Sequence, residues 1–254
     1  MYAPERHRAI VEQITAAGRA SVVELADALA VTPETIRRDL SIMERQGLIR
    51  RVHGGAIPVL RRLPYEPTVD RRSSELTAEK QRIAAAALDE VPQAGAIVID
   101  AGTSTAQLVS LLGEDRELTV VTNSVQHALM LAGRSNINLL LVGGRVRGRT
   151  LACVDSWATS ALKGLCADVA FVGTDGVSVE RGLTTPDRTE AEIKAAMLAA
   201  ARRKVVLADH TKFGTDHFAQ FAAIEDIDVI ISDSGLDDED VERIEAAGPV
   251  VVCA

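Results

Sequence analysis

Residues 21–40, SVVELADALAVTPETIRRDL, carry the start signals of two helices separated by a very short turn. Ser21 and Glu24 form an S-x-x-E capping box, which predicts a short helix running through residue 29. The Thr-Pro-Glu at 32–34 supplies an N-cap, a proline at the first helical position and an acid in the first turn, which predicts a second helix. Two helices joined in this way are typical of a helix-turn-helix.

The flanking sequence completes a small domain around this motif. Residues 4–17 repeat apolar side chains at helical spacing, which predicts a preceding helix. After the second helix of the motif, residues 48–52 are strand-like, 53–55 can turn and 56–57 can return, which predicts a β-wing. We therefore predict a winged helix-turn-helix domain over residues 1–58.

The second helix of the motif has an apolar face and an opposite polar face. Apolar residues recur at helical spacing over 36–43 and belong in a core. Recognition helices contact base edges with their outer face and N-terminal end, and nearby groups contact phosphates. We expect Arg38 and Thr35 to enter the groove and Arg37 to contact the DNA backbone or Asp39. The predicted DNA-binding residues are Thr32, Glu34, Thr35, Arg37, Arg38, Ser41, Arg45, Arg50, Arg51 and His53.

Charge is distributed unevenly along the chain. The whole chain has a formal net charge of −8, but residues 1–72 contain twelve arginines, no lysine and nine acidic residues. The first part is thus basic at +3 and the remainder acidic at −11. A basic segment on an acidic body indicates a polyanionic partner. We therefore expect a double-stranded DNA operator as partner.

The pattern changes after a basic, proline-containing stretch that we predict to be a linker over residues 59–74. Over residues 75–254, apolar runs alternate with helical stretches, which is typical of a mostly parallel sheet covered on both faces. The fold class is therefore α/β. The predicted strands are 96–99, 118–121, 137–142, 169–172, 205–207, 229–231 and 250–252, and the predicted helices are 77–90, 104–113, 125–133, 156–164, 187–202 and 237–246.

Polar residues follow five of these strands, and ligands of open parallel sheets bind at the carboxyl ends of the strands. Small and hydroxyl-bearing residues before a helix can bind a phosphate, while carboxylates suit sugar hydroxyls. Glu190 and Lys194, four residues apart on a helix, fit either this site or a surface salt bridge. The predicted effector-binding residues are Asp100, Gly102, Thr103, Ser104, Thr105, Thr122, Asn123, Ser124, Gly143, Gly144, Asp175, Gly176, Glu190, Lys194, Asp209 and Lys212.

The motifs resemble those of the DeoR family of bacterial transcriptional regulators across nearly the whole chain. The first domain carries Val31-Thr32-x-x-Thr35-Ile36-Arg37-Arg38-Asp39-Leu40 and Gly47-Leu48-x-Arg50-x-x-His53-Gly54-Gly55-Ala56. The second carries Lys80-x-x-Ile83-Ala84, Asp100-x-Gly102-Thr103-x-Thr105, Val121-Thr122-Asn123-Ser124, Gly143-Gly144, Gly173-Thr174-Asp175-Gly176, Glu190-Ala191-x-Ile193-Lys194 and Ala208-Asp209-His210-x-Lys212-Phe213-Gly214.

This resemblance implies a sensor domain similar in fold to ribose-5-phosphate isomerase, with a phosphorylated sugar or related metabolite as effector. It also implies a repressor of carbohydrate metabolism genes, and we expect a homodimer or homotetramer on its operator. The chain departs from the family at Asp155, where glycine is common, so the family's loop geometry is not carried over to residues 150–156.

An alternative is a sugar-phosphate isomerase with a DNA-binding appendage, because Asp100, Asp175, Glu190, Lys194 and Lys212 include residue types that proton transfer needs. An isomerase has no use for a recognition helix, so we expect a regulator without catalytic residues.

Cofactor and metal sites are not predicted by any motif. There is neither a G-x-G-x-x-G nor a Walker-type phosphate loop. Three cysteines without C-x-x-C spacing indicate a reduced protein, and His210 and His217 lack the spacing of metal ligands. Neither a secretory leader nor an apolar run of membrane-spanning length is evident, so we expect a cytoplasmic protein without a membrane partner.

Overall fold

The computed structural model describes residues 3–17, 19–45, 48–52, 54–58 and 66–254. The chain divides into two compact units, Met1–Tyr65 and Glu66–Ala254. Of the linker predicted over 59–74, residues 59–65 lie outside the described residues. Residues 66–74 belong to the second unit, because the chain there is hydrogen-bonded to that unit and forms a helix, α4 (Val69–Ser74).

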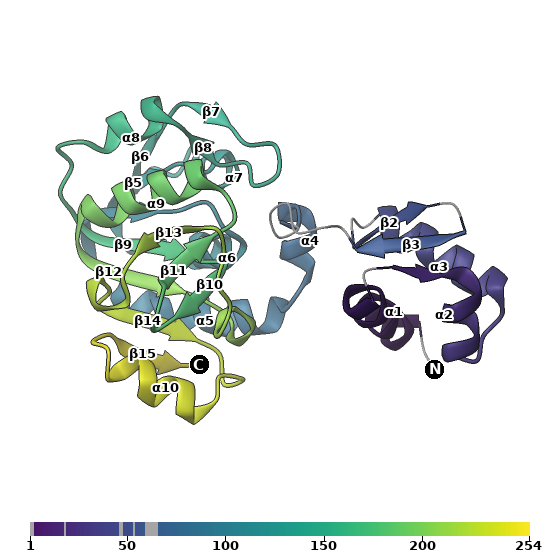
Figure 1. Ribbon diagram of the computed structural model, residues 1–254. Helices are drawn as coiled ribbons and strands as arrows, with labels where there is room; N and C mark the ends of the chain where they lie inside the picture. The colour runs from purple at the N-terminus through teal and green to yellow at the C-terminus, as the bar shows by residue number, and fades with distance from the viewer. Residues whose placement is uncertain (1–2, 18, 46–47, 53, 59–65) are drawn as a thin grey trace. The chain divides into compact units, whose positions relative to one another are not determined.

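The first unit is a three-helix core with a small antiparallel sheet, as predicted (Figure 1). The predicted capping box is present at Ser21 and Glu24. Helices α1, α2 and α3 bury an aliphatic core that includes Ile14, Leu25 and Leu40. The elements are α1 (Ala3–Ala17), β1 (Ala20–Ser21), α2 (Val22–Ala28), α3 (Pro33–Arg45), β2 (Ile49–Val52) and β3 (Gly55–Pro58).

Strand β1 was not predicted, because two residues are too short to show a pattern. It pairs with β3, and the backbones approach so closely that a Cβ on Gly55 would lie 2.3 Å from the carbonyl oxygen of Ala20. Glycine at position 55 therefore lets the wing close against the start of α2.

The second unit is built on a seven-stranded sheet with the order β15-β14-β12-β9-β4-β5-β6, in which every neighbouring pair is parallel. All seven predicted strands are in it. The strands are β4 (Ala94–Ile99), β5 (Glu117–Thr122), β6 (Ile137–Leu141), β9 (Ala167–Gly173), β12 (Ala201–Leu207), β14 (Val229–Ser232) and β15 (Val250–Cys253).

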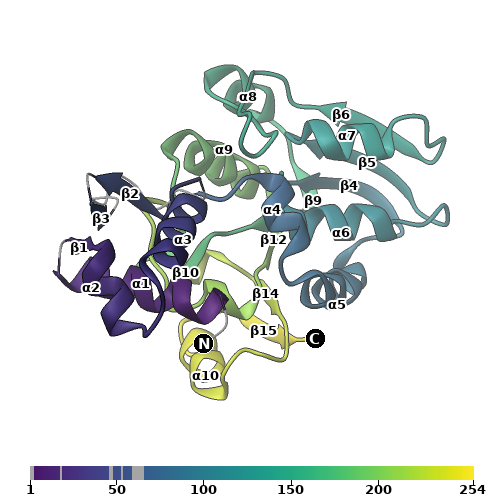
Figure 2. The ribbon, with the colours of Figure 1, turned by 90° about the vertical axis from the view of Figure 1, so that its right-hand side faces the viewer.

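Helices cover both faces of this sheet and enclose two separate aliphatic cores (Figures 1 and 2). Successive residues of β4 belong to different cores. Ile97 and Ile99 pack in the core with α5, α6 and α7, whereas Val98 packs in the core with α8, α9 and α10. The helices are α5 (Thr77–Ala87), α6 (Thr103–Leu111), α7 (Val125–Leu131), α8 (Ser156–Leu162), α9 (Arg188–Ala199) and α10 (Asp238–Glu245), with short 3-10 turns at Leu88–Glu90, His210–Lys212 and Ile224–Asp226.

Two small antiparallel elements were not predicted. One is the hairpin of β7 (Arg145–Val146) and β8 (Cys153–Val154), and the other is the sheet of β10 (Gly176–Ser178), β11 (Gly182–Thr185) and β13 (Ala219–Ala222). Their strands have two to four residues, too few for a recognisable alternation of apolar and polar side chains. None of the described helices is long and apolar enough to cross a lipid bilayer.

Candidate DNA-binding surface and ligand pocket

The N-terminal end of α3 presents an ordered polar surface. The hydroxyl of Thr32 accepts a hydrogen bond from the backbone N–H of Thr35 at 3.2 Å, and the two threonine hydroxyls are 2.9 Å apart. Arg37 pairs with Glu34 at 3.0 Å. Arg38 is exposed and has no partner among the described residues. Its guanidinium is thus available for an external acceptor.

The predicted alternative contact from Arg37 to Asp39 is wrong, because Asp39 faces the core side of α3. Its carboxylate is buried and binds Arg6 of α1 at 2.6 Å and His7 at 3.0 Å. Burial alone raises the pKa of Asp39, but these two partners outweigh it and hold the pKa below its usual value. The charged pair fixes α1 against α3 and leaves the outer face of α3 to the arginines.

The wing is attached to the same face. Arg51 donates from its guanidinium to the hydroxyl of Ser41 at 2.9 Å and from its backbone N–H to Glu44 at 3.0 Å. Of the other predicted contacts, Glu34 is exposed, the side chains of Arg45 and Arg50 are outside the described part, and His53 lies outside the described residues. Ser41 and Arg51 are therefore brought together with Arg37 on one surface of the first unit.

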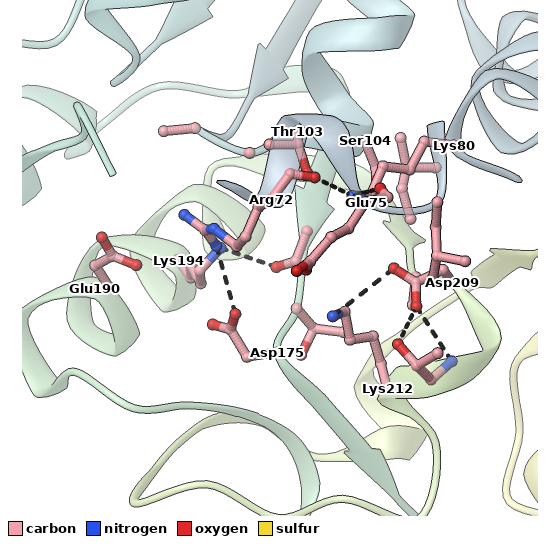
Figure 3. A pocket seen from close by; sticks show the side chains of 18 residues that line it. Arg72, Glu75, Lys80, Thr103, Ser104, Asp175, Glu190, Lys194, Asp209 and Lys212 are labelled. Atoms are coloured by element: carbon pink, nitrogen blue, oxygen red, sulfur yellow. Dashed lines mark hydrogen bonds and ion pairs between the residues drawn. The ribbon is translucent and has the colours of Figure 1, made fainter. Parts of the chain in front are cut away.

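In the second unit, the strand order places a candidate site between β4 and β9. From β4 the chain adds β5 and β6 on one side, and from β9 it adds β12, β14 and β15 on the other. Ligands of such sheets bind at this switch point, at the carboxyl ends of the strands. The structure has a pocket there, lined by the loops after β4, β9 and β12 together with α4, α5 and α9 (Figure 3).

The predicted residues that line this pocket are Gly102, Thr103, Ser104, Asp175, Glu190, Lys194, Asp209 and Lys212. Its other polar side chains are Arg72, Glu75, Lys80, Thr174 and Thr211. Thr174 and Thr211 lie in two of the predicted strand-end loops, whereas Arg72, Glu75 and Lys80 were not predicted to line a site. Lys80 belongs to the motifs of the family resemblance, but no pattern in the sequence places it at this pocket.

A buried ion pair forms the floor of the pocket. The Lys194 ammonium donates to the carboxylate of Asp100 and, at 2.9 Å, to the carbonyl oxygen of Gly173. Burial alone lowers the pKa of Lys194, but Asp100 and Glu190 outweigh it and raise the pKa, so the lysine stays charged. Asp100 lies beneath the pocket lining, not in it, and its charge is neutralised by this contact.

The loop between β4 and α6 supplies uncommitted hydrogen-bond donors. Gly102 is the N-cap of α6 and provides no side-chain cap for the first backbone N–H groups. The hydroxyls of Thr103 and Ser104 line the pocket and have no hydrogen-bond partner among the described residues. Hydroxyls and N–H groups at a helix N-terminus form a favourable site for an anion.

Opposite charges alternate around the rest of the pocket (Figure 3). Lys212 is 3.8 Å from Asp209, a distance that leaves its ammonium available to a ligand. Asp175 accepts from Thr185 at 2.8 Å and lies 3.5 Å from the guanidinium of Arg72. The pocket thus offers cationic donors for an anion and carboxylate acceptors for hydroxyl groups.

The carboxylate of Glu190 is held in place by Arg147. This arginine contacts Glu190 at 2.6 Å, Glu66 at 2.7 Å and Asp187 at 3.3 Å, and the two glutamates raise its pKa. Glu190 and Lys194 are both buried, so the surface salt bridge considered for them is wrong. The network joins the segment before α4 to the pocket wall.

Several predicted ligand residues instead stabilise the loops. The hydroxyls of Thr105 and Thr122 donate to backbone carbonyls, Asn123 accepts from Ala101 at 2.9 Å, and Ser124 caps α7. They do not line the pocket. The same holds for the glycines predicted at the strand ends, namely Gly143, Gly144 and Gly176.

Asp155 has a positive φ of 87°, a conformation that favours glycine. Its carboxylate compensates by accepting from the backbone N–H groups of Trp157 at 3.0 Å and Arg145 at 3.3 Å. The loop therefore keeps an unusual backbone with an aspartate, away from the pocket lining.

Comparison with known proteins covers both units. A family model described as the DeoR-like helix-turn-helix domain matches residues 6–60, and one described as the DeoR C-terminal sensor domain matches residues 75–234. The chain is 39% identical to the HTH-type transcriptional regulator GlpR of Haloferax volcanii, over 99% of this chain and 98% of that protein. It is 30% identical to the glycerol-3-phosphate regulon repressor of Escherichia coli, over 91% of this chain and 90% of that protein.

Among solved structures, ribose 5-phosphate isomerase A from Neisseria gonorrhoeae matches 54% of this chain and 53% of its own. The sequence identity is 19% and the TM-score is 0.39. A similarity of this size says nothing of function.

Proposed function

The chain belongs to the DeoR family of transcriptional regulators, and from that membership we propose that it represses carbohydrate metabolism genes under the control of a phosphorylated sugar. The first unit binds a DNA operator through α3 and the wing. The second unit binds the effector in the pocket at the β4–β9 switch point. Such a protein acts in the cytoplasm, where its operator is.

The observation that carries the effector assignment is the combination of donors in one pocket. Thr103, Ser104 and the start of α6 offer hydroxyl and N–H donors beside the charged groups of Lys212 and Arg72. Asp209 and Asp175 can accept from sugar hydroxyls. A phosphate group with a polyhydroxylated chain satisfies both sets, whereas an uncharged sugar leaves the cationic donors unmatched.

The names of relatives support this class of effector and the sign of regulation. One relative is a glycerol-3-phosphate regulon repressor, which names a phosphorylated polyol and repression together. Linkage then requires that the effector and the operator change each other's affinity by the same factor. A homodimer or homotetramer would present two or more copies of α3 to a repeated or palindromic operator.

Two of the carboxylates named for an isomerase, Asp100 and Glu190, are not free to act as a general base. Asp100, a candidate base for proton transfer, is buried and paired with Lys194 beneath the pocket. Glu190 is similarly held by Arg147 and Thr150. A general base needs a free lone pair facing the substrate, and both side chains are committed to structural contacts.

The pocket assignment predicts that phosphorylated sugars bind and their unphosphorylated counterparts do not. We expect glycerol 3-phosphate, ribose 5-phosphate or fructose 6-phosphate to bind wild-type protein in a calorimetric titration. Lys212→Ala should weaken that binding about 10-fold, the value of one charge-assisted hydrogen bond. Lys163→Ala removes an exposed lysine outside the pocket and should bind normally. If Lys212→Ala binds these phosphorylated compounds as tightly as wild type does, the loop after β12 is not part of the binding site.

A further inference from the structure

Arg72 has two buried donors that nothing in the described structure satisfies. Its Nη1 is 3.5 Å from Asp175, while its Nε and Nη2 are buried and lack a hydrogen-bond partner. The side chain is 17% exposed and lines the pocket. Leaving a buried donor unpaired is costly, and a guanidinium is shaped to bind an oxyanion through two parallel hydrogen bonds. An oxyanion in contact with Arg72 would supply the missing acceptors.

Residues 66–75 form the segment that carries Arg72. This segment is held at both ends by contacts that reach the same pocket. At its start, Glu66 binds Arg147, which also binds the pocket residue Glu190. At its end, the buried Lys80 ammonium donates to the carbonyl oxygens of Arg72 and Glu75 (Figure 3). Burial lowers the pKa of Lys80, and the nearby carboxylate of Asp209 opposes this shift.

This segment is also the part of the second unit that the chain enters directly from the DNA-binding unit. We propose that Arg72 reports occupancy of the pocket to the DNA-binding unit: an oxyanion of the ligand takes its two unpartnered donors, and α4 adopts the position that this contact favours. The inference rests on the proposed sensing function and assigns its regulation to one side chain. The ligand shifts the equilibrium between positions of α4, because it contacts α4 only in the position in which Arg72 faces the ligand.

The mechanism separates ligand binding from the response to the ligand. The donors of α6 and Lys212 remain in the pocket when Arg72 is replaced, so a ligand can still bind there at higher concentration. Without Arg72, however, the bound ligand no longer contacts α4, the first helix that the chain forms after the DNA-binding unit. A variant at position 72 should therefore bind the ligand and fail to respond to it.

The test uses the full chain with glycerol 3-phosphate, ribose 5-phosphate and inorganic phosphate as probes. Hydrogen exchange is measured over residues 66–75 and 101–106, and release of bound operator DNA is measured in parallel. In wild type, a probe should slow exchange in both segments and shift DNA binding. In Arg72→Gln, the probe should bind about 10- to 100-fold more weakly. At saturation it should slow exchange over 101–106 only and leave the DNA complex unchanged.

Two further variants make the result specific. Arg71→Gln changes the adjacent residue, which pairs with Glu75 at 2.8 Å on the exposed side of α4 and does not line the pocket, and it should respond as wild type does. Arg72→Lys should recover part of the affinity, because it keeps the charge but not the two parallel donors. Normal protection of 66–75 and normal DNA release in Arg72→Gln would overturn the inference. If no probe alters either segment in wild type, the sensing function itself fails, and the inference fails with it.

Discussion

Replacing Lys194 by methionine should destabilise the second unit by about 3–5 kcal/mol, the usual cost of removing one partner of a buried ion pair. Lys194 is 4% exposed and Asp100 is 1% exposed. After the substitution, Asp100 keeps a hydrogen bond from the backbone N–H of Gly173 at 3.2 Å but loses its only salt-bridge partner among the described residues. The isolated carboxylate must then be buried as a charge or become protonated, and either change costs free energy.

Urea unfolding followed by circular dichroism measures this loss. The double variant Asp100→Asn/Lys194→Met should recover most of the stability, because it removes both charges together. Lys163→Met changes an exposed lysine and serves as the control for the substitution itself. A loss below about 1 kcal/mol for Lys194→Met would contradict a charged, buried pair under the pocket.

Replacing Arg38 by alanine should lower operator affinity by about 10- to 100-fold, as expected for the loss of one bidentate contact to a base. Arg38 is exposed on α3 and is uncommitted among the described residues, whereas Arg37 is paired with Glu34. Because base contacts carry sequence information and phosphate contacts do not, Arg38→Ala should also reduce discrimination between operator and unrelated DNA.

Fluorescence anisotropy with a duplex selected by the wild-type protein from a random pool tests this difference. Arg37→Ala should weaken binding to operator and unrelated duplex by similar factors and make the salt dependence less steep, as a phosphate contact predicts. Undiminished operator affinity in Arg38→Ala would show that α3 does not read the bases through this residue.

Local sequence signals predicted most of the fold. The caps of α2 and α3 depend on a few neighbouring residues, such as Ser21 and Glu24, and the structure confirms the capping box. The parallel strands are continuous apolar runs, because both of their faces are buried. This pattern allowed all seven strands to be predicted from the sequence. The short antiparallel strands, such as β10 and β11, have three and four residues and carry no comparable pattern.

The pocket was predicted less completely, because strand order cannot be read from the chain. Loops after five strands have similar polar residues, but only those after β4, β9 and β12 line the pocket. Asn123 follows β5 and Gly143 follows β6, which lie one and two strands beyond β4 on the side away from β9. Arg72 and Lys80 were missed because they precede the first strand of the sheet, and only the folded structure brings them to its carboxyl end.

The proposed function couples a phosphate-binding pocket to operator DNA within one protein. The most direct measurement titrates the full chain onto labelled duplex from the region upstream of its own gene, or onto a selected duplex, and then adds phosphorylated sugars with their unphosphorylated counterparts as controls. We predict tight, salt-sensitive binding that at least one phosphorylated sugar shifts and its counterpart does not. Specific DNA binding that no phosphorylated compound alters would contradict this coupling.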